Sequence, residues 1–122
     1  EWGTYLDTRS QSHNFDIARA GWIGDYLDPS TFLDMFVTGG TQNDGLYSNK
    51  TYDELLQKSR ETSGNERYQL LMEAEKVLID QDMAILPLYY YVTQNLIDTD
   101  KWDGWYPNPL NVHPWKFIRP KK

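Results

Sequence analysis

A short segment of the sequence holds residue types that together could bind a charged organic molecule. Arg19, Trp22 and Asp25 follow one another closely and supply a guanidinium, an indole and a carboxylate. A guanidinium pairs with carboxylates, a carboxylate pairs with ammonium groups, and an aromatic face packs against apolar groups. Asp25 lies between Trp22 and Tyr26, so we expect its carboxylate to be partly desolvated and to need a cationic partner. This combination suits a zwitterion with apolar side chains, such as a peptide.

Each of these residues also has a purely structural interpretation. Asp25 could serve a local turn, and Arg19, which lies in an apolar segment, could form an ion pair with Asp25. Arg9 could be a solvated arginine on a helix. The three tyrosines at 89–91 could pack in a core, because a strand points alternate side chains to opposite faces. The residue pattern leaves the binding and the structural interpretations open.

The sequence argues against metal, cofactor and nucleic-acid sites. His13 and His113 lie far apart with no carboxylate at ligand spacing, which disfavours a metal site. The chain has no cysteine and no glycine-rich motif for a nucleotide phosphate, which excludes disulfides and thiolate sites. The formal net charge of −6 disfavours binding to the phosphate backbone of nucleic acids. We therefore expect no metal, no cofactor and no nucleic-acid partner.

A group of carboxylates suggests a second functional hypothesis. Asp25, Asp28 and Asp34 follow an expected strand, and paired carboxylates perform acid–base catalysis in glycosidases. Asp28 has a simpler role as a helix cap before Pro29. Aromatic residues make up 15% of the chain and could stack on sugar rings or cover another protein. A small secreted carbohydrate-binding or glycan-hydrolysing domain and a structural interaction module therefore stay open as alternatives.

The first part of the chain is expected to form a helix, a strand and a second short helix. Residues 2–12 have aromatic and aliphatic side chains at helical spacing. Residues 14–22 alternate in the manner of a strand, and glycines follow them. A capping residue and a proline at 28–29 predict a helix start. The side chains expected to point inward from that short helix are Phe32, Leu33 and Phe36.

The middle of the chain predicts a helical hairpin, and the following residues predict strands. Residues 51–61 open with a Thr-x-x-Glu capping box, and residues 65–80 have the spacing of a longer amphipathic helix. Residues 83–97 are rich in β-branched and aromatic types, with the main strand expected after Pro87. The tail is expected to add at most a short strand near 115–118.

Length and the first residue bear on domain organisation. The 122 residues suit one domain. The sequence opens on Glu1, with neither an initiator methionine nor a charged and apolar leader, so we expect a piece of a longer protein. No apolar run approaches the length of a membrane-spanning helix.

The segment 18–29, Ala-Arg-Ala-Gly-Trp-Ile-Gly-Asp-Tyr-Leu-Asp-Pro, resembles a signature block of bacterial oligopeptide-binding proteins. These proteins are the extracytoplasmic solute-binding receptors of peptide ABC importers. The resemblance covers nearly the whole chain, because further segments match the family in the same order. Those segments are 2–9, 52–56, 74–78 and 84–92.

The resemblance implies an α/β fold, in which the chain is the C-terminal fragment of a two-lobed periplasmic-binding-protein-like architecture. A mixed sheet with packed helices is expected in such a fold. Residues 1–91 would form part of the C-terminal lobe, as helix, strand, helical hairpin and strand. Residues 92–122 would cross the hinge and return as a tail to the N-terminal lobe.

The resemblance also implies the identity of the ligand-binding residues. Asp25 matches an aspartate that pairs with the α-ammonium of the peptide, and Trp22 matches a position that contacts the peptide near that end. Arg19 and Arg9 match arginines that bind ligand carboxylates. Two aromatic residues match further positions in the cleft, namely Trp2 and Tyr91.

A receptor of this family binds its ligand without catalysis, so the resemblance implies no catalytic residue. The implied partners are peptides, the remaining N-terminal part of the same receptor and the permease subunits of the importer. The fragment could also self-associate, because a truncated lobe exposes apolar area. The implied location is extracytoplasmic, either in a periplasm or lipid-anchored to the outer face of the cytoplasmic membrane.

Overall fold

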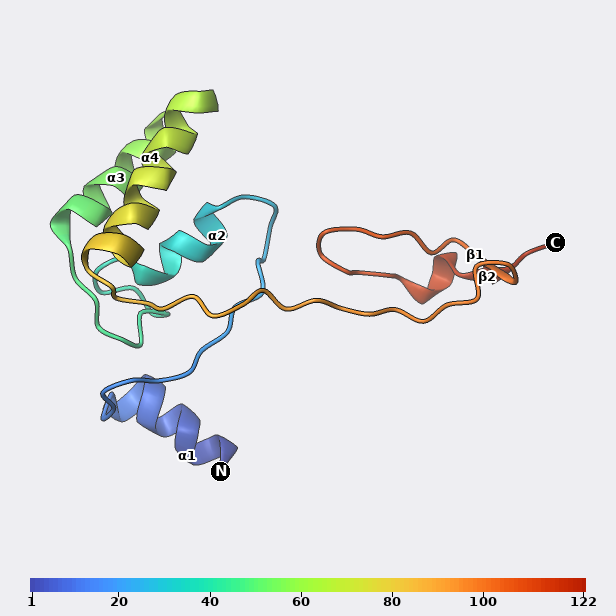
Figure 1. The fold of residues 1–122 in the computed structure, drawn as a ribbon, viewed down its shortest axis with the longest axis horizontal. Helices are drawn as coiled ribbons and strands as arrows, with labels where there is room; N and C mark the ends of the chain where they lie inside the picture. The colour runs from blue at the N-terminus through green and yellow to red at the C-terminus, as the bar shows by residue number, and fades with distance from the viewer. The chain divides into compact units, whose positions relative to one another are not determined.

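The computed structural model describes residues 1–122. The chain divides into two compact units, Glu1–Pro87 and Leu88–Lys122, which are described separately (Figure 1). No helix of the chain is both long and apolar enough to cross a membrane.

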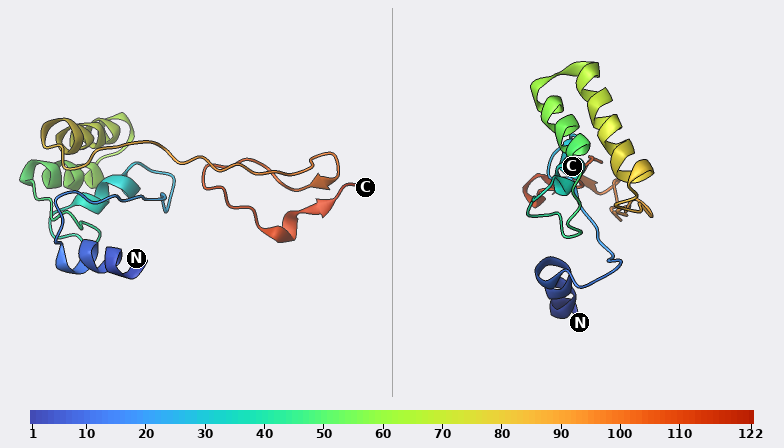
Figure 2. Two further views of the ribbon diagram at one scale, coloured as in Figure 1. Left: turned by 60° about the horizontal axis from the view of Figure 1, so that its bottom comes forward. Right: turned by 90° about the vertical axis from the view of Figure 1, so that its left-hand side faces the viewer.

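A helical hairpin is the centre of the first unit. Helix α3, Lys50–Glu61, packs along helix α4, Gly64–Lys76, and a π-helical turn, Val77–Gln81, extends α4 (Figure 2). The hairpin and the amphipathic pattern that predicted it are confirmed. Aliphatic side chains and one tyrosine form the buried core, in which most residues come from these helices. The core residues are Leu33, Tyr52, Leu56, Leu71, Ala74, Val77 and Leu78.

The start of α3 differs from the prediction. The predicted capping box at Thr51 is wrong, because Thr51 already lies inside the helix. Asn49 is the cap, and its side-chain oxygen accepts a hydrogen bond from the backbone N–H of Tyr52 at 3.1 Å. An asparagine side chain can satisfy an unpaired N–H of the first turn as well as a threonine can. The helix therefore begins after Asn49, two residues before the predicted cap.

Two shorter helical segments precede the hairpin. Helix α1, Trp2–Asp7, continues as a π-helical turn, Thr8–Ser12, so the helix predicted at 2–12 is confirmed. Helix α2, Ser30–Leu33, continues as a 3₁₀ turn, Asp34–Phe36. Leu33 is buried as predicted, whereas Phe32 is 47% exposed, because the helix is too short to bury a second face.

The strands that the sequence predicted are largely unpaired. The only ladder joins β1, Trp102–Asp103, to β2, Arg119–Pro120, in an antiparallel pair. The segments at 14–22 and 88–97 form no ladder, because no other strand of this chain lies beside them. A strand requires a neighbour for its backbone groups, and β-prone composition alone does not supply one.

The second unit is a chain with little regular structure. The short strand predicted near 115–118 lies directly after these residues, as β2, and a 3₁₀ turn occupies Trp115–Phe117. Gly104 has a φ of +87°, and a Cβ there would overlap the carbonyl oxygen of Phe117, so only glycine fits this close approach. The indole of Trp105 stacks on His113 with ring centroids 5.1 Å apart.

Candidate functional site

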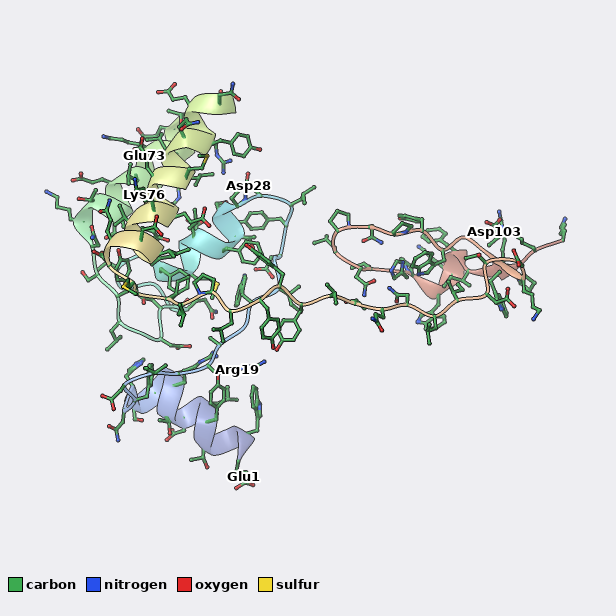
Figure 3. The ribbon with its side chains drawn as sticks, in the orientation of Figure 1. Glu1, Arg19, Asp28, Glu73, Lys76 and Asp103 are labelled. Atoms are coloured by element: carbon green, nitrogen blue, oxygen red, sulfur yellow. The ribbon has the colours of Figure 1, made fainter.

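The segment between α1 and α2 carries three of the predicted ligand-binding residues. It has no regular secondary structure, and Figure 3 shows it running from Arg19 to Asp28 at the start of α2. Backbone at both ends of the segment is tied to neighbouring elements. The phenol of Tyr5 in α1 donates a hydrogen bond to the carbonyl oxygen of Arg19, and the Asp25 N–H donates to the hydroxyl of Thr31 in α2 at 3.0 Å.

Asp25 is exposed, so the prediction that its carboxylate is partly desolvated is wrong for this chain. Tyr26 beside it is 47% exposed and does not enclose the carboxylate. The reason is the absence of a neighbouring strand along this segment, which leaves one side of it uncovered. The backbone of Asp25 is nevertheless held in place, while its side chain faces solvent.

Trp22 is half-buried, in contrast to the residues that flank it. Its indole Nε1 is buried and has no hydrogen-bond partner within the chain. An indole N–H that is shielded from water loses a favourable interaction unless a polar group reaches it. A polar group from outside could reach this donor only if the atoms that enclose it moved.

Arg9 is held by groups of its own chain. Its Nε lies 2.6 Å from the Asp44 carboxylate, and one terminal nitrogen donates to the Tyr5 hydroxyl at 3.0 Å. Its guanidinium also lies over the Tyr5 ring, 5.4 Å from the centroid. The ring Nδ1 of His13 is 2.9 Å from the carbonyl oxygen of Asp44, so a second side chain also contacts Asp44. A carboxylate ligand of Arg9 would therefore compete with Asp44.

A hollow of about 430 Å³ lies between α1 and the extended segment. Arg9 and Arg19 both line it, together with Tyr5, Phe15 and Ile17. Both arginines therefore border one concave surface, whose walls are mainly apolar. Trp22 and Asp25 do not line this hollow.

Two predicted aromatic residues are exposed. Trp2 is 66% exposed and stacks on Tyr5, with ring centroids 5.0 Å apart. Tyr91 belongs to the second unit and is also 66% exposed, with its ring edge-on to that of Tyr89 at 4.9 Å. Alternate tyrosines thus lie on one side of the extended chain, which agrees with the period of a strand.

Several known proteins with similar sequences are named as peptide-binding proteins. The chain is 39% identical over 107 residues to the periplasmic oligopeptide-binding protein OppA of Salmonella typhimurium, a match that covers 87% of this chain and 19% of the relative. It is 40% identical over 115 residues to the periplasmic murein peptide-binding protein MppA of Escherichia coli, covering 92% of this chain and 21% of that protein. The chain is homologous to about a fifth of an oligopeptide-binding protein.

A solved structure supports the same assignment. The murein tripeptide-binding protein MppA of Escherichia coli superimposes with a TM-score of 0.77 at 32% identity, covering 100% of this chain and 24% of that protein. No protein-family profile matches the chain. The structural similarity confirms the predicted fold class, an α/β fragment of the periplasmic peptide-binding fold.

The sequence did not reveal the ion pair between Asp28 and Arg67. Both terminal nitrogens of Arg67 donate to the Asp28 carboxylate, at 2.7 and 2.8 Å, and Asp28 also accepts from the Ser30 N–H at 2.9 Å. Hydrogen bonds from the Arg67 guanidinium hold the pKa of Asp28 well below its usual range and raise the pKa of Arg67. The two residues are far apart in the chain, and no local sequence pattern predicts such a contact.

One further carboxylate of this region also has a cationic partner. Asp34 accepts a hydrogen bond from Arg60 at 2.8 Å. Because Asp28 and Asp34 are each committed to an arginine, neither carboxylate is placed as the partner of Asp25 in acid–base catalysis. The structure therefore does not favour the glycan-hydrolysing alternative.

Proposed function

We propose that this chain is part of an extracytoplasmic receptor that captures oligopeptides by their termini for an ABC importer. The observation that carries the proposal is the sequence match to an oligopeptide-binding protein along 87% of this chain. The chain spans about a fifth of the length of the relatives it matches, so the activity belongs to a longer receptor of which these residues form a part.

Asp25 is the residue that we propose to bind the α-ammonium of the peptide, with Trp22 beside it. An ammonium–carboxylate pair fixes the register of a peptide without reading its side chains, and its strength grows when water is excluded. Asp25 is exposed in this chain, so its carboxylate is accessible to a ligand, and the proposal assigns the exclusion of water to the rest of the receptor. The indole of Trp22 lies on the same segment, and its enclosed N–H would become a donor for a peptide carbonyl only if the atoms around it moved.

Arg19 and Arg9 are proposed to act at ligand carboxylates. They line one hollow, which supports a shared role. Arg9 is already paired with Asp44 at 2.6 Å, so its contribution depends on release or sharing of that pair. Trp2 and Tyr91 are proposed as apolar contacts of the cleft, because both rings are exposed.

The rest of the receptor supplies the opposite wall in this proposal. Residues 1–91 belong to the C-terminal lobe and residues 92–122 to the hinge and the returning tail. The uncovered side of the extended segment at 14–22 and the exposed residues at 88–92 support the presence of partner strands elsewhere in the receptor. The other proposed partners are the permease subunits of the importer.

We propose binding without catalysis, and a location outside the cytoplasmic membrane, either periplasmic or lipid-anchored. The relatives are named as periplasmic binding proteins, which supports both statements. No cofactor takes part in this proposal, because charge pairing and apolar packing suffice to hold a peptide.

Capture from a peptide mixture tests the proposal. The full-length receptor that carries this chain is incubated with synthetic short peptides, half of them N-acetylated, and bound peptides are measured by native mass spectrometry. We expect bound peptides with a strong excess of free amino termini, and little capture by the isolated 122-residue chain. Failure of the full-length receptor to retain any peptide, or tight binding by the isolated chain, would contradict the two-lobed receptor.

A further inference from the structure

The backbone just before the proposed ammonium site rests directly on α2. The Asp25 N–H donates to Oγ1 of Thr31 at 3.0 Å, and Thr31 is only 4% exposed. A buried hydroxyl that accepts a backbone hydrogen bond cannot be replaced by water when it is removed. This contact fixes the position from which the Asp25 side chain leaves the backbone.

Gly24 brings the two segments into contact. A Cβ at Gly24 would lie 3.2 Å from Cγ2 of Thr31 and 3.3 Å from the Phe32 ring. These distances are tighter than ordinary van der Waals contact, so a larger residue would require Thr31 or Phe32 to move by a few tenths of an ångström. The absence of a side chain at this position lets the Asp25 N–H reach the Thr31 hydroxyl.

Helix α2 is itself held in place by the hairpin. It has only four residues, and an isolated helix of that length is not stable in water. At its start, Asp28 receives two hydrogen bonds from Arg67 of α4, at 2.7 and 2.8 Å. At its end, the buried Tyr52 of α3 donates to the carbonyl oxygen of Leu33 at 2.6 Å. The place of α2 is therefore determined by α3 and α4.

These contacts form one continuous connection from the hairpin to the exposed carboxylate. We propose that Thr31 and Arg67 are positioning residues, which set the place of the Asp25 carboxylate for the ammonium group of a peptide. The inference rests on the proposed function, since it assigns a role in binding to two residues that act through Asp25. A carboxylate on a fixed backbone loses less freedom on binding than one on a mobile loop.

Affinity for peptides with free and with blocked amino termini distinguishes positioning from a general structural role. Thr31→Val removes the acceptor and keeps the shape of the side chain, and Thr31→Ser restores the hydroxyl. Ser59→Ala is the matched control. Ser59 carries a buried hydroxyl, as Thr31 does, but it lies in α3 and donates to the Leu56 carbonyl at 2.7 Å. All variants are made in the full-length receptor, and calorimetry uses the peptide that the wild-type receptor retains from the mixture.

We expect Thr31→Val to weaken binding of the free peptide about tenfold and the N-acetylated peptide hardly at all. Thr31→Ser should restore affinity, and Ser59→Ala should lower the melting temperature without changing affinity. In an Asp25→Asn background, Thr31→Val should cause no further loss, because the two residues act through one contact. A full additional loss in that background would overturn the inference.

Arg67→Gln provides a second variant, in case Thr31→Val does not fold. We expect the same selective loss for the free peptide, with partial recovery in Arg67→Lys, which keeps the charge without the two-pronged geometry. If Asp25→Asn leaves affinity for the free peptide unchanged, the proposed function fails. If Asp25→Asn weakens binding while Thr31→Val and Arg67→Gln do not, only the positioning role fails.

Discussion

The two units of the chain use their apolar residues in opposite ways. In Glu1–Pro87, two helices bury a shared core, and every buried residue of the chain lies in this unit. In Leu88–Lys122, large apolar side chains are exposed, among them Tyr90 at 94% and Leu96 at 101%. The comparison shows that a helical hairpin forms its core from nearby residues, whereas an extended segment needs partners from elsewhere.

A pair of identical substitutions tests this contrast most strongly. Leu78 is 1% exposed in the core, and Leu96 is fully exposed in the second unit. We expect Leu78→Ala to lower the free energy of unfolding by about 2–5 kcal/mol, because it removes buried methyl groups and leaves a cavity. Leu96→Ala should change it by less than about 0.5 kcal/mol. Denaturant titration of the 122-residue chain measures both, and equal effects would contradict the division into two units.

The pH dependence of stability should also differ between ion pairs of the two units. The folded pKa of Asp28 lies below its usual value of 3.8 because Arg67 donates to it, so this pair stabilises the fold above that pH. The stabilisation is lost as the pH falls towards the folded pKa. We expect Arg67→Gln to cost about 1–2 kcal/mol at neutral pH, with the difference from wild type shrinking at pH near 3.

Arg119→Gln is the control for that measurement, since Arg119 pairs with Asp103 in the second unit at 3.4 Å and both side chains are more than half exposed. The pKa of Asp103 is also lowered, first by the Gly104 N–H and then by Arg119. We expect this variant to unfold as the wild type does at every pH, because solvent screens an exposed pair. A constant difference between Arg67→Gln and wild type across the pH range would refute the role of Asp28.

Association of the chain with itself is the smallest effect that the comparison predicts. The exposed segment at 88–92 offers apolar side chains and a backbone that joins no sheet ladder, and both features favour pairing with another copy. We expect sedimentation of the 122-residue chain to depend on concentration, and that of a chain cut after Pro87 to depend on it less. An equal concentration dependence in the two chains would show that the segment at 88–92 does not mediate self-association.

The sequence was sufficient for the features that depend on near neighbours. The hairpin was predicted because Tyr52, Leu56 and Leu71 lie at helical spacings, which need no knowledge of distant residues. The choice of Asn49 over Thr51 as the cap was not predicted, because both residue types can accept the same hydrogen bond. The expected strands lacked partners, since pairing depends on residues that are distant or absent from this chain.

The candidate site was accessible to sequence reasoning only in part. Residue types at Arg19, Trp22 and Asp25 suggested a zwitterionic ligand, and the family resemblance assigned a role to each of them. The ion pair between Asp28 and Arg67 and the hydrogen bond from the Asp25 N–H to Thr31 could be found only from the three-dimensional structure, because they join separate elements. The Asp25 carboxylate was predicted to be partly desolvated but is exposed, because residues that are aromatic neighbours in the sequence do not by themselves enclose a side chain.

The most direct test of the account compares two exposed aspartates of the same segment. Asp25 and Asp16 both face solvent, and only Asp25 is proposed to meet the peptide ammonium. Calorimetry on the full-length receptor should show at least a tenfold loss of affinity for a free peptide in Asp25→Asn, no loss for its N-acetylated form, and no change in Asp16→Asn. Equal affinity of wild type and Asp25→Asn for the free peptide would contradict the central claim.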